Sequence, residues 1–214
     1  IMSTSKIRVW DPFVRLFHWS LVTCFIIAYL SAEEESLVHI YSGYAVIALV
    51  LSRTIWGFIG TKYTRFKQFS YSPTSVLMYL KDFASSQPNH YTGHNPAAAW
   101  MIFALLICLI MTSISGLKVY GAEGYGPLAS YPALPATAST DFSLITNAHA
   151  KDTHSRGHDE GELEEVWEEI HEFFANLTLL LVFVDIAGAV VASRVHNENL
   201  IKAMITGNKQ SHTD

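Results

Sequence analysis

The stretch LLLVFVDIAGAVVAS, residues 179–193, decides the fold of this 214-residue chain. It is apolar except for Asp185, and the apolar run continues on its N-terminal side. A helix that crosses a bilayer needs about 20 such residues. A carboxylate deep in hydrocarbon costs a few kcal/mol even on lenient scales, so ionisable residues there usually belong to functional sites. The stretch therefore predicts a membrane-spanning helix and raises the question of what Asp185 does in it.

Three other segments are apolar over a similar length. Half of the chain is hydrophobic and 15% is charged, whereas about 25% of a typical soluble domain is charged. These segments lack the consistent polar stripe that the core helices of a soluble bundle carry. The expected fold is therefore all-α, with residues 1–214 forming one integral membrane four-helix bundle. We expect its spans at about residues 13–32, 37–59, 97–117 and 167–193.

The basic residues give an orientation, because Lys and Arg are enriched in cytoplasmic loops. Most of the 14 basic residues precede the first span, separate the second from the third, or follow the fourth. We therefore expect both termini in the cytoplasm and a long outer loop at residues 118–165. The chain should be a multi-pass membrane protein. This topology accounts for the basic residues, so we expect no nucleic-acid partner.

Two segments outside the spans have a readable pattern. Residues 73–83 place apolar side chains on one helical face, which predicts a short amphipathic helix on the cytoplasmic membrane surface, with a polar loop as the alternative. The apolar residues concerned are Val76, Leu77, Leu80 and Phe83. In the outer loop, NAHAKDTHSRGHDEGE (147–162) should be polar and mobile, its histidines solvated, so that the fourth helix starts near Glu162.

Three histidines stand near span ends, and the topology assigns their depth. His39 and His171 begin spans that run inward, so both belong to the outer leaflet, whereas His18 belongs to the inner leaflet. Asp185 follows His171 by fourteen residues, which places it on nearly the same helix face and about 21 Å deeper, at the level of His18. The sequence thus indicates two candidate ligand pairs, His39 with His171 and His18 with Asp185.

Two histidines that face each other across a helical bundle are what a six-coordinate b-type haem requires. Gly43, one turn after His39, leaves room for a flat porphyrin, although small residues also serve plain helix packing. Arg15 has the position of a cation for haem propionates. As the alternative, Arg15 and Arg53 determine topology and extend to the lipid headgroups.

The chain resembles the bacterial cytochrome b561 and nickel–iron hydrogenase cytochrome b family. The resembling pieces follow the family's order over nearly the whole chain: VWDPFVRLFHWS, VHIYSGYAVI, RTIWGFIG, GHNPAAAWMIFALL, EEIHEFFANL and ENLIKAMITG. The resemblance implies a protein of the bacterial inner membrane that carries electrons between quinone and a redox partner, with two b haems, one near each membrane face.

Carried over by position, His18, His39 and His171 match three of the family's four haem-ligand histidines. The fourth position is Asp185, in VFVDIAGAV, where the family has histidine. Carboxylate is a poor axial ligand for low-spin haem. We therefore expect one haem b, with iron bound by His39 and His171, and an inner haem that is absent or altered. The vacated pocket can instead serve quinone or protons, or Asp185 can simply remain a neutral acid.

The resemblance implies an electron-transfer subunit, with quinone as substrate and a periplasmic c-type cytochrome or a hydrogenase-like subunit as partner. The acids before His171 either stabilise the start of the fourth helix or dock a basic electron carrier. They are Glu162, Glu164, Glu165, Glu168 and Glu169. Two alternatives stay open: a self-sufficient haem enzyme that passes electrons from superoxide to quinone, and a haem-free membrane anchor.

Overall fold

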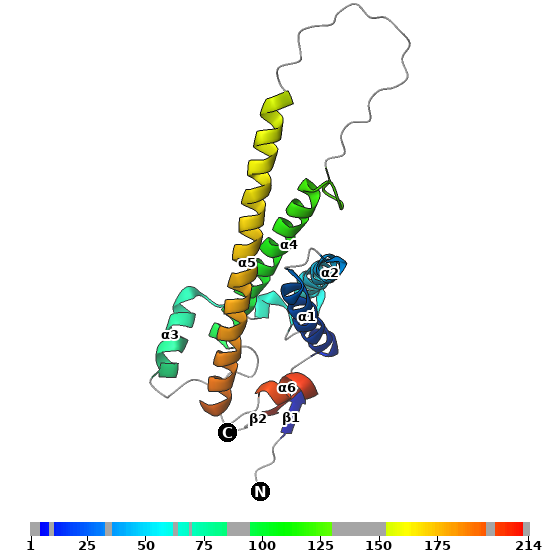
Figure 1. The fold of residues 1–214 in the computed structure, drawn as a ribbon. Helices are drawn as coiled ribbons and strands as arrows, with labels where there is room; N and C mark the ends of the chain where they lie inside the picture. The colour runs from blue at the N-terminus through cyan, green and yellow to red at the C-terminus, as the bar shows by residue number, and fades with distance from the viewer. Residues whose placement is uncertain are drawn as a thin grey trace, which may run out of the picture. The chain divides into compact units, whose positions relative to one another are not determined.

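The fold consists of long helices joined by short elements (Figure 1). The computed structural model describes the backbone of residues 5–8, 11–32, 36–61, 64–68, 70–84, 95–129, 153–195 and 200–211. The long helices are α1 (Pro12–Leu30), α2 (Leu37–Ile59), α4 (Pro96–Ala122) and α5 (Thr153–Val195). The shorter elements are β1 (Ser5–Arg8), η2 (Phe66–Gln68), α3 (Pro73–Ala84), α6 (Leu200–Thr206) and β2 (Asn208–Ser211).

The predicted all-α fold with four spans is confirmed. Within the described residues, four helical segments are long and apolar enough to cross a membrane: Pro12–Leu30, Leu37–Ile59, Pro96–Ala122 and Leu163–Val195. Large apolar side chains on these segments point outward, among them Leu30 and Phe58, which are 77% and 71% exposed. A soluble monomer rarely exposes such continuous apolar surface, whereas lipid covers it in a membrane.

Three of the long helices begin at residues that suit a helix N-terminus. The Asp11 carboxylate accepts a hydrogen bond from the Phe13 amide at 2.8 Å, and Asn95 Oδ1 accepts one from the Ala98 amide at 2.7 Å. Each is followed by proline, whose missing N–H costs nothing in the first turn. Ser36 caps α2 in the same way, with its hydroxyl 3.3 Å from the amide nitrogen of His39. The caps fix the residues at which these spans start.

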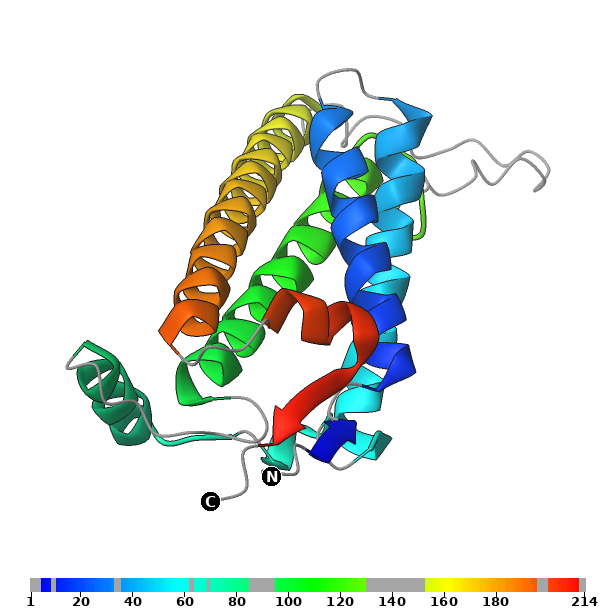
Figure 2. The same ribbon diagram turned by 90° about the horizontal axis from the view of Figure 1, so that it is seen from below.

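The chain forms two compact units, Ile1–Ile110 with Ala175–Asp214, and Met111–Phe174. In the first unit α1 and α2 pack as an antiparallel pair, side by side in Figure 2. Its core is built around Val46 and Val50 of α2 and Leu109 of α4. Leu21, Cys24, Phe25, Leu106 and Ile110 pack against these three residues. The second unit contains the C-terminal part of α4 and the N-terminal half of the long helix α5.

Arg53 does not extend to the headgroups, and that interpretation is corrected. Its side chain is 5% exposed, and its Nη1 donates to the carbonyl of Thr64 at 3.4 Å. The guanidinium also lies 5.2 Å from the ring centroid of Phe66. The chain after α2 folds back over the helix end, and a side chain at Gly57 would overlap the Phe66 ring. The buried Arg53 side chain therefore links α2 to the turn that follows it.

The amphipathic helix expected near residues 73–83 exists as α3, and its apolar side chains divide between a buried side and an exposed side. Val76 and Tyr79 are buried, at 8% and 5% exposure, and the Tyr79 ring lies 5.9 Å from that of Phe83. Leu77 and Leu80 are 66% and 48% exposed. The spacing of 76, 79 and 83 also makes one helical stripe, and the aromatic ring of Tyr79 occupies the protein side. The leucines are left on the outer side.

The expected outer loop, residues 118–165, is shorter at both ends. Helix α4 runs to Ala122, and α5 begins at Thr153 rather than near Glu162. The part of 147–162 from Thr153 onward is helical and continuous with the apolar part of α5. His149 and the side chains of His154, His158 and Glu162 lie outside the part of the chain that the structure describes.

Candidate haem-ligand site

His39 lies in the first turn of α2 and reaches across to the end of α1. Its Nδ1 is 2.8 Å from the carbonyl oxygen of Ala28. The carbonyl of Ala28 is available because the last four carbonyls of a helix have no partner within the helix. A carbonyl only accepts, so Nδ1 carries the proton, and in the neutral imidazole the lone pair lies on Nε2. This tautomer is the one in which Nε2 can bind a metal.

His171 has the same arrangement on a different pair of helices. It lies on α5, and its Nδ1 is 2.9 Å from the carbonyl oxygen of Thr112 on α4. The hydroxyl of Ser115 is 3.3 Å from the same nitrogen. Here too the carbonyl fixes the proton on Nδ1 and leaves the lone pair on Nε2.

Both histidines therefore have the chemistry of metal-ligating imidazoles. A histidine that binds a metal through one nitrogen generally donates the other N–H to a carbonyl, a carboxylate or water, which fixes the tautomer and the ring orientation. His39 belongs to the first compact unit and His171 to the second. The donor set of two such imidazoles fits the axial ligation of a b-type haem.

Gly43 lies beside open space on α2, one turn after His39. A Cβ added there would meet no atom within 4 Å. A flat porphyrin could lie against α2 at Gly43 only if this space were open, so the structure is compatible with that prediction.

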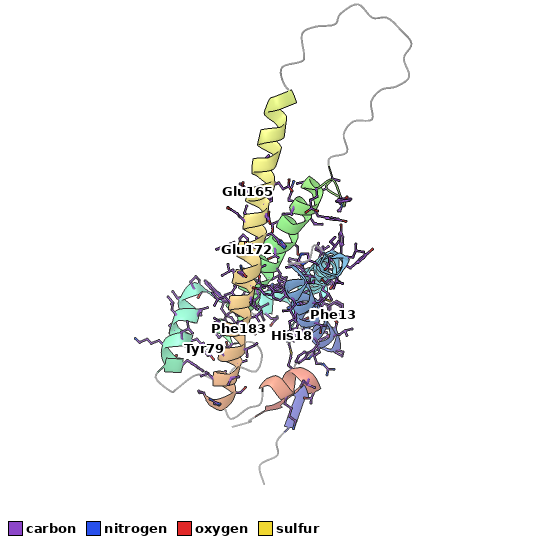
Figure 3. All side chains as sticks on the ribbon, viewed as in Figure 1. Phe13, His18, Tyr79, Glu165, Glu172 and Phe183 are labelled. Carbon is purple, nitrogen blue, oxygen red and sulfur yellow. The ribbon has the colours of Figure 1, made fainter. Side chains whose placement is uncertain are left out.

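Helix α1 carries His18, and the predicted partner Asp185 lies on α5 in the same unit (Figure 3 labels His18). The ring of His18 meets that of Trp19 edge-on, with centroids 5.4 Å apart. Both side chains are partly buried, and neither makes a hydrogen bond or an ion pair with any other described residue. The inner pair thus lacks the carbonyl acceptors that orient His39 and His171.

Arg15 precedes His18 by one helical turn and ties α1 to the C-terminal segment. Its Nη1 donates to the carbonyl of Ile205 in α6 at 2.7 Å. Its Nε is buried without a hydrogen-bond partner among the described residues. The predicted role as a propionate cation therefore stands beside a structural one, which the sequence did not indicate.

The second-unit part of α5 carries an acidic face. Glu165, Glu168, Glu169 and Glu172 are exposed and lie at helical spacing, and Figure 3 labels the first and the last. Trp167 lies between them along the chain, and the Lys118 ammonium is 5.8 Å from its ring centroid. This contact ties α4 to α5 beside the acidic face.

A membrane helical bundle with two imidazoles of this tautomer has the features of a b-type cytochrome, and comparison with known proteins agrees. The family described as prokaryotic cytochrome b561 matches residues 9–207, so the chain belongs to that family. It is a bacterial membrane cytochrome of the electron-transport class, and the family implies haem b.

The relatives are distant in sequence but similar in extent. A "Probable Ni/Fe-hydrogenase B-type cytochrome subunit" of Rhizobium leguminosarum bv. viciae is 23% identical over 95% of this chain and 89% of its own length. A protein of the same name from Bradyrhizobium diazoefficiens is 23% identical over 95% and 86%. The Escherichia coli K12 "Probable Ni/Fe-hydrogenase 1 B-type cytochrome subunit" is 22% identical over 69% and 72%. No solved structure matches the chain.

Proposed function

We propose that this cytochrome carries electrons between the quinone pool and a redox partner at the outer face of the bacterial inner membrane, through one haem b whose iron His39 and His171 would bind. One observation carries the proposal. Each of these imidazoles donates its Nδ1 proton to a main-chain carbonyl of a neighbouring helix, which leaves Nε2 as the nitrogen that binds iron. When bound, haem supplies a one-electron ferric–ferrous couple.

The surrounding chain sets how such a couple behaves. A carbonyl acceptor on Nδ1 makes Nε2 more electron-rich, which favours the ferric state and lowers the midpoint potential. Both acceptors belong to helix backbones, which move little, so the two rings keep their orientation when the oxidation state changes. The space beside Gly43 gives a flat ligand access to α2. These features suit repeated electron transfer without large rearrangement.

The partner is expected to be positively charged where it meets the protein. The exposed acids Glu165, Glu168, Glu169 and Glu172 precede or adjoin His171 on α5, on the side that the charge distribution assigns to the periplasm. Opposite charges speed diffusional encounter between redox partners. The names of the relatives suggest a hydrogenase subunit as the partner, and a basic c-type cytochrome has the same chemistry.

The inner site is expected to lack a normal haem. His18 has no second histidine opposite it at the Asp185 position, and neither side chain is oriented by a hydrogen bond among the described residues. Electrons from quinol then enter close to the outer haem rather than through a two-haem chain. The orientation with both termini in the cytoplasm is part of this proposal. The pairing of β1 with β2 requires the two ends to lie on the same side of the membrane, as they do in this orientation, but does not distinguish the two sides.

The test is the number of haems per polypeptide, measured by pyridine haemochrome on the purified protein. We expect a ratio near one, which His39→Ala and His171→Ala both abolish and which the matched variant His18→Ala leaves unchanged. A ratio near two that falls to one in His18→Ala contradicts the single-haem proposal. Protein without a Soret band is a membrane anchor. Quinone reduction by superoxide without any partner identifies the stand-alone enzyme instead.

A further inference from the structure

The ring of His171 lies directly against the backbone of α4 at Gly116. A Cβ added to Gly116 would fall 2.8 Å from Cε1 and 3.1 Å from Nδ1 of that ring. Such a distance to Cε1 is shorter than van der Waals contact permits. Any residue other than glycine at position 116 would therefore push the imidazole away from α4.

This close approach is what brings Nδ1 to its acceptor. The Thr112 carbonyl lies one turn before Gly116 and already accepts the amide of residue 116 in the helical ladder. A carbonyl oxygen has a second lone pair, and the ring reaches it at 2.9 Å. If the ring were displaced by the width of a methyl group, this hydrogen bond would lengthen beyond the range in which it is effective.

Ser115 completes the arrangement. It is 1% exposed, and its hydroxyl lies 2.8 Å from the carbonyl of Met111, to which it donates. With its hydrogen so directed, the Oγ lone pairs are available to the Nδ1–H of His171 at 3.3 Å. The Nδ1 proton is thus shared between the Thr112 carbonyl and the Ser115 hydroxyl, which fixes both the tautomer and the rotation of the ring.

We propose that Gly116 and Ser115 are positioning residues for His171: Gly116 sets how closely the imidazole approaches α4, and Ser115 sets its rotation. Neither residue touches the iron, and both act through the ring. This inference rests on the proposed function, because it assigns the two residues to the ligand of the outer haem. His39 is oriented differently, by the free end of α1 across the hairpin, so the two axial ligands depend on separate backbone features.

The variants are Gly116→Ala and Ser115→Ala in the full-length haem protein, with Gly188→Ala and Ser113→Ala as matched controls. A Cβ at Gly188 meets nothing within 4 Å, and Ser113 lies two residues from Ser115 on α4, on another side of the helix. The readouts are haem retention, the midpoint potential and the g-values of the low-spin ferric signal. Loss of a hydrogen-bond partner of a ligand commonly lowers metal affinity about 10- to 100-fold.

We expect Gly116→Ala to bind haem about 10- to 100-fold more weakly than the parent protein and therefore to lose it during purification. We expect Ser115→Ala to retain haem, with a higher midpoint potential and shifted g-values. Both controls should match the parent protein. If Gly116→Ala and Ser115→Ala keep the parent's haem content, potential and g-values, the proposal is wrong.

A failure of the proposed function gives a different result. In that case the parent protein lacks haem, or His171→Ala keeps it. The positioning is then read directly from the ring ¹⁵N shifts of His171 in the protein as purified. A proton on Nδ1 in the parent that Gly116→Ala displaces supports the inference, whereas a proton on Nε2 in the parent overturns it.

Discussion

His39 and His171 differ from His18 in what surrounds their rings. Each of the first two donates to a main-chain carbonyl of another helix, at 2.8 and 2.9 Å. For His18 the described surroundings supply an edge-on contact with Trp19 and no hydrogen bond. The two histidines proposed to bind haem thus each have a carbonyl acceptor that orients the ring. His18, whose predicted partner is Asp185, has no such acceptor among the described residues.

The largest expected change comes from restoring the missing ligand. Asp185→His supplies the histidine that the family resemblance implies at this position, so we expect the haem ratio to rise from about one to about two. Pyridine haemochrome analysis and a second midpoint in a redox titration measure it, with Asp185→His combined with His18→Ala as the control. An unchanged ratio in a folded variant would mean that the inner pocket has lost more than its ligand.

The acidic face next to His171 gives a smaller, kinetic effect. Replacing Glu165, Glu168, Glu169 and Glu172 together by glutamine should slow electron transfer to a basic c-type cytochrome by about tenfold at low ionic strength, because electrostatic steering is lost. Stopped-flow measurements over a salt series test it. The difference should disappear in about 1 M salt, where the Debye length is about 3 Å. Equal rates at low salt would show that partners bind elsewhere.

A stability effect of a few degrees is expected where α1 is tied to α5. The Tyr29 hydroxyl donates to Asn176 Oδ1 at 2.8 Å. Tyr29 directly follows Ala28, whose carbonyl accepts the hydrogen bond from His39. Tyr29→Phe should cost about 1 kcal/mol, or a fall in Tm of about 2–4 °C. Tyr41→Phe is the control, since Tyr41 is 69% exposed. An equal fall in Tm in both variants would show that the hydrogen bond between Tyr29 and Asn176 does not stabilise the protein.

The smallest effect is expected from Asp185→Asn, which keeps the shape of the side chain and removes its acid. If the carboxyl group is a neutral remnant of a lost ligand, haem content and quinol oxidation should match those of the parent protein. Steady-state quinol oxidation is the measurement. A fall of tenfold or more would instead assign Asp185 a part in proton transfer, because general acid–base groups commonly contribute about 10²- to 10⁴-fold.

The spans could be predicted because composition encodes them, whereas the ligand roles of His39, His171 and His18 stay predictions. Long apolar runs identify the four spans, and helix geometry relates His171 to Asp185. Gly116, Ser115 and the Ala28 carbonyl could not be predicted, because their role depends on which helix lies opposite. The SISG run at residues 113–116 was the available signal, since small residues allow close helix approach.

Two interpretations were wrong for identifiable reasons. The start of α5 was placed too late because a polar stretch was taken as irregular, although its glutamates favour a helix. The alternative that Arg53 extends to the headgroups is also wrong, because the turn after α2 provides a carbonyl and an aromatic ring that hold its buried side chain.

The short sheet has a consequence for the order of events during biogenesis. Strand β1 precedes the first span and β2 follows α6, and Ser5 pairs with Ser211. Strand β2 follows the four spans along the chain, so β1 is synthesised first and stays unpaired with β2 while the spans are made. Closure of this antiparallel pair therefore requires synthesis of the chain beyond the fourth span.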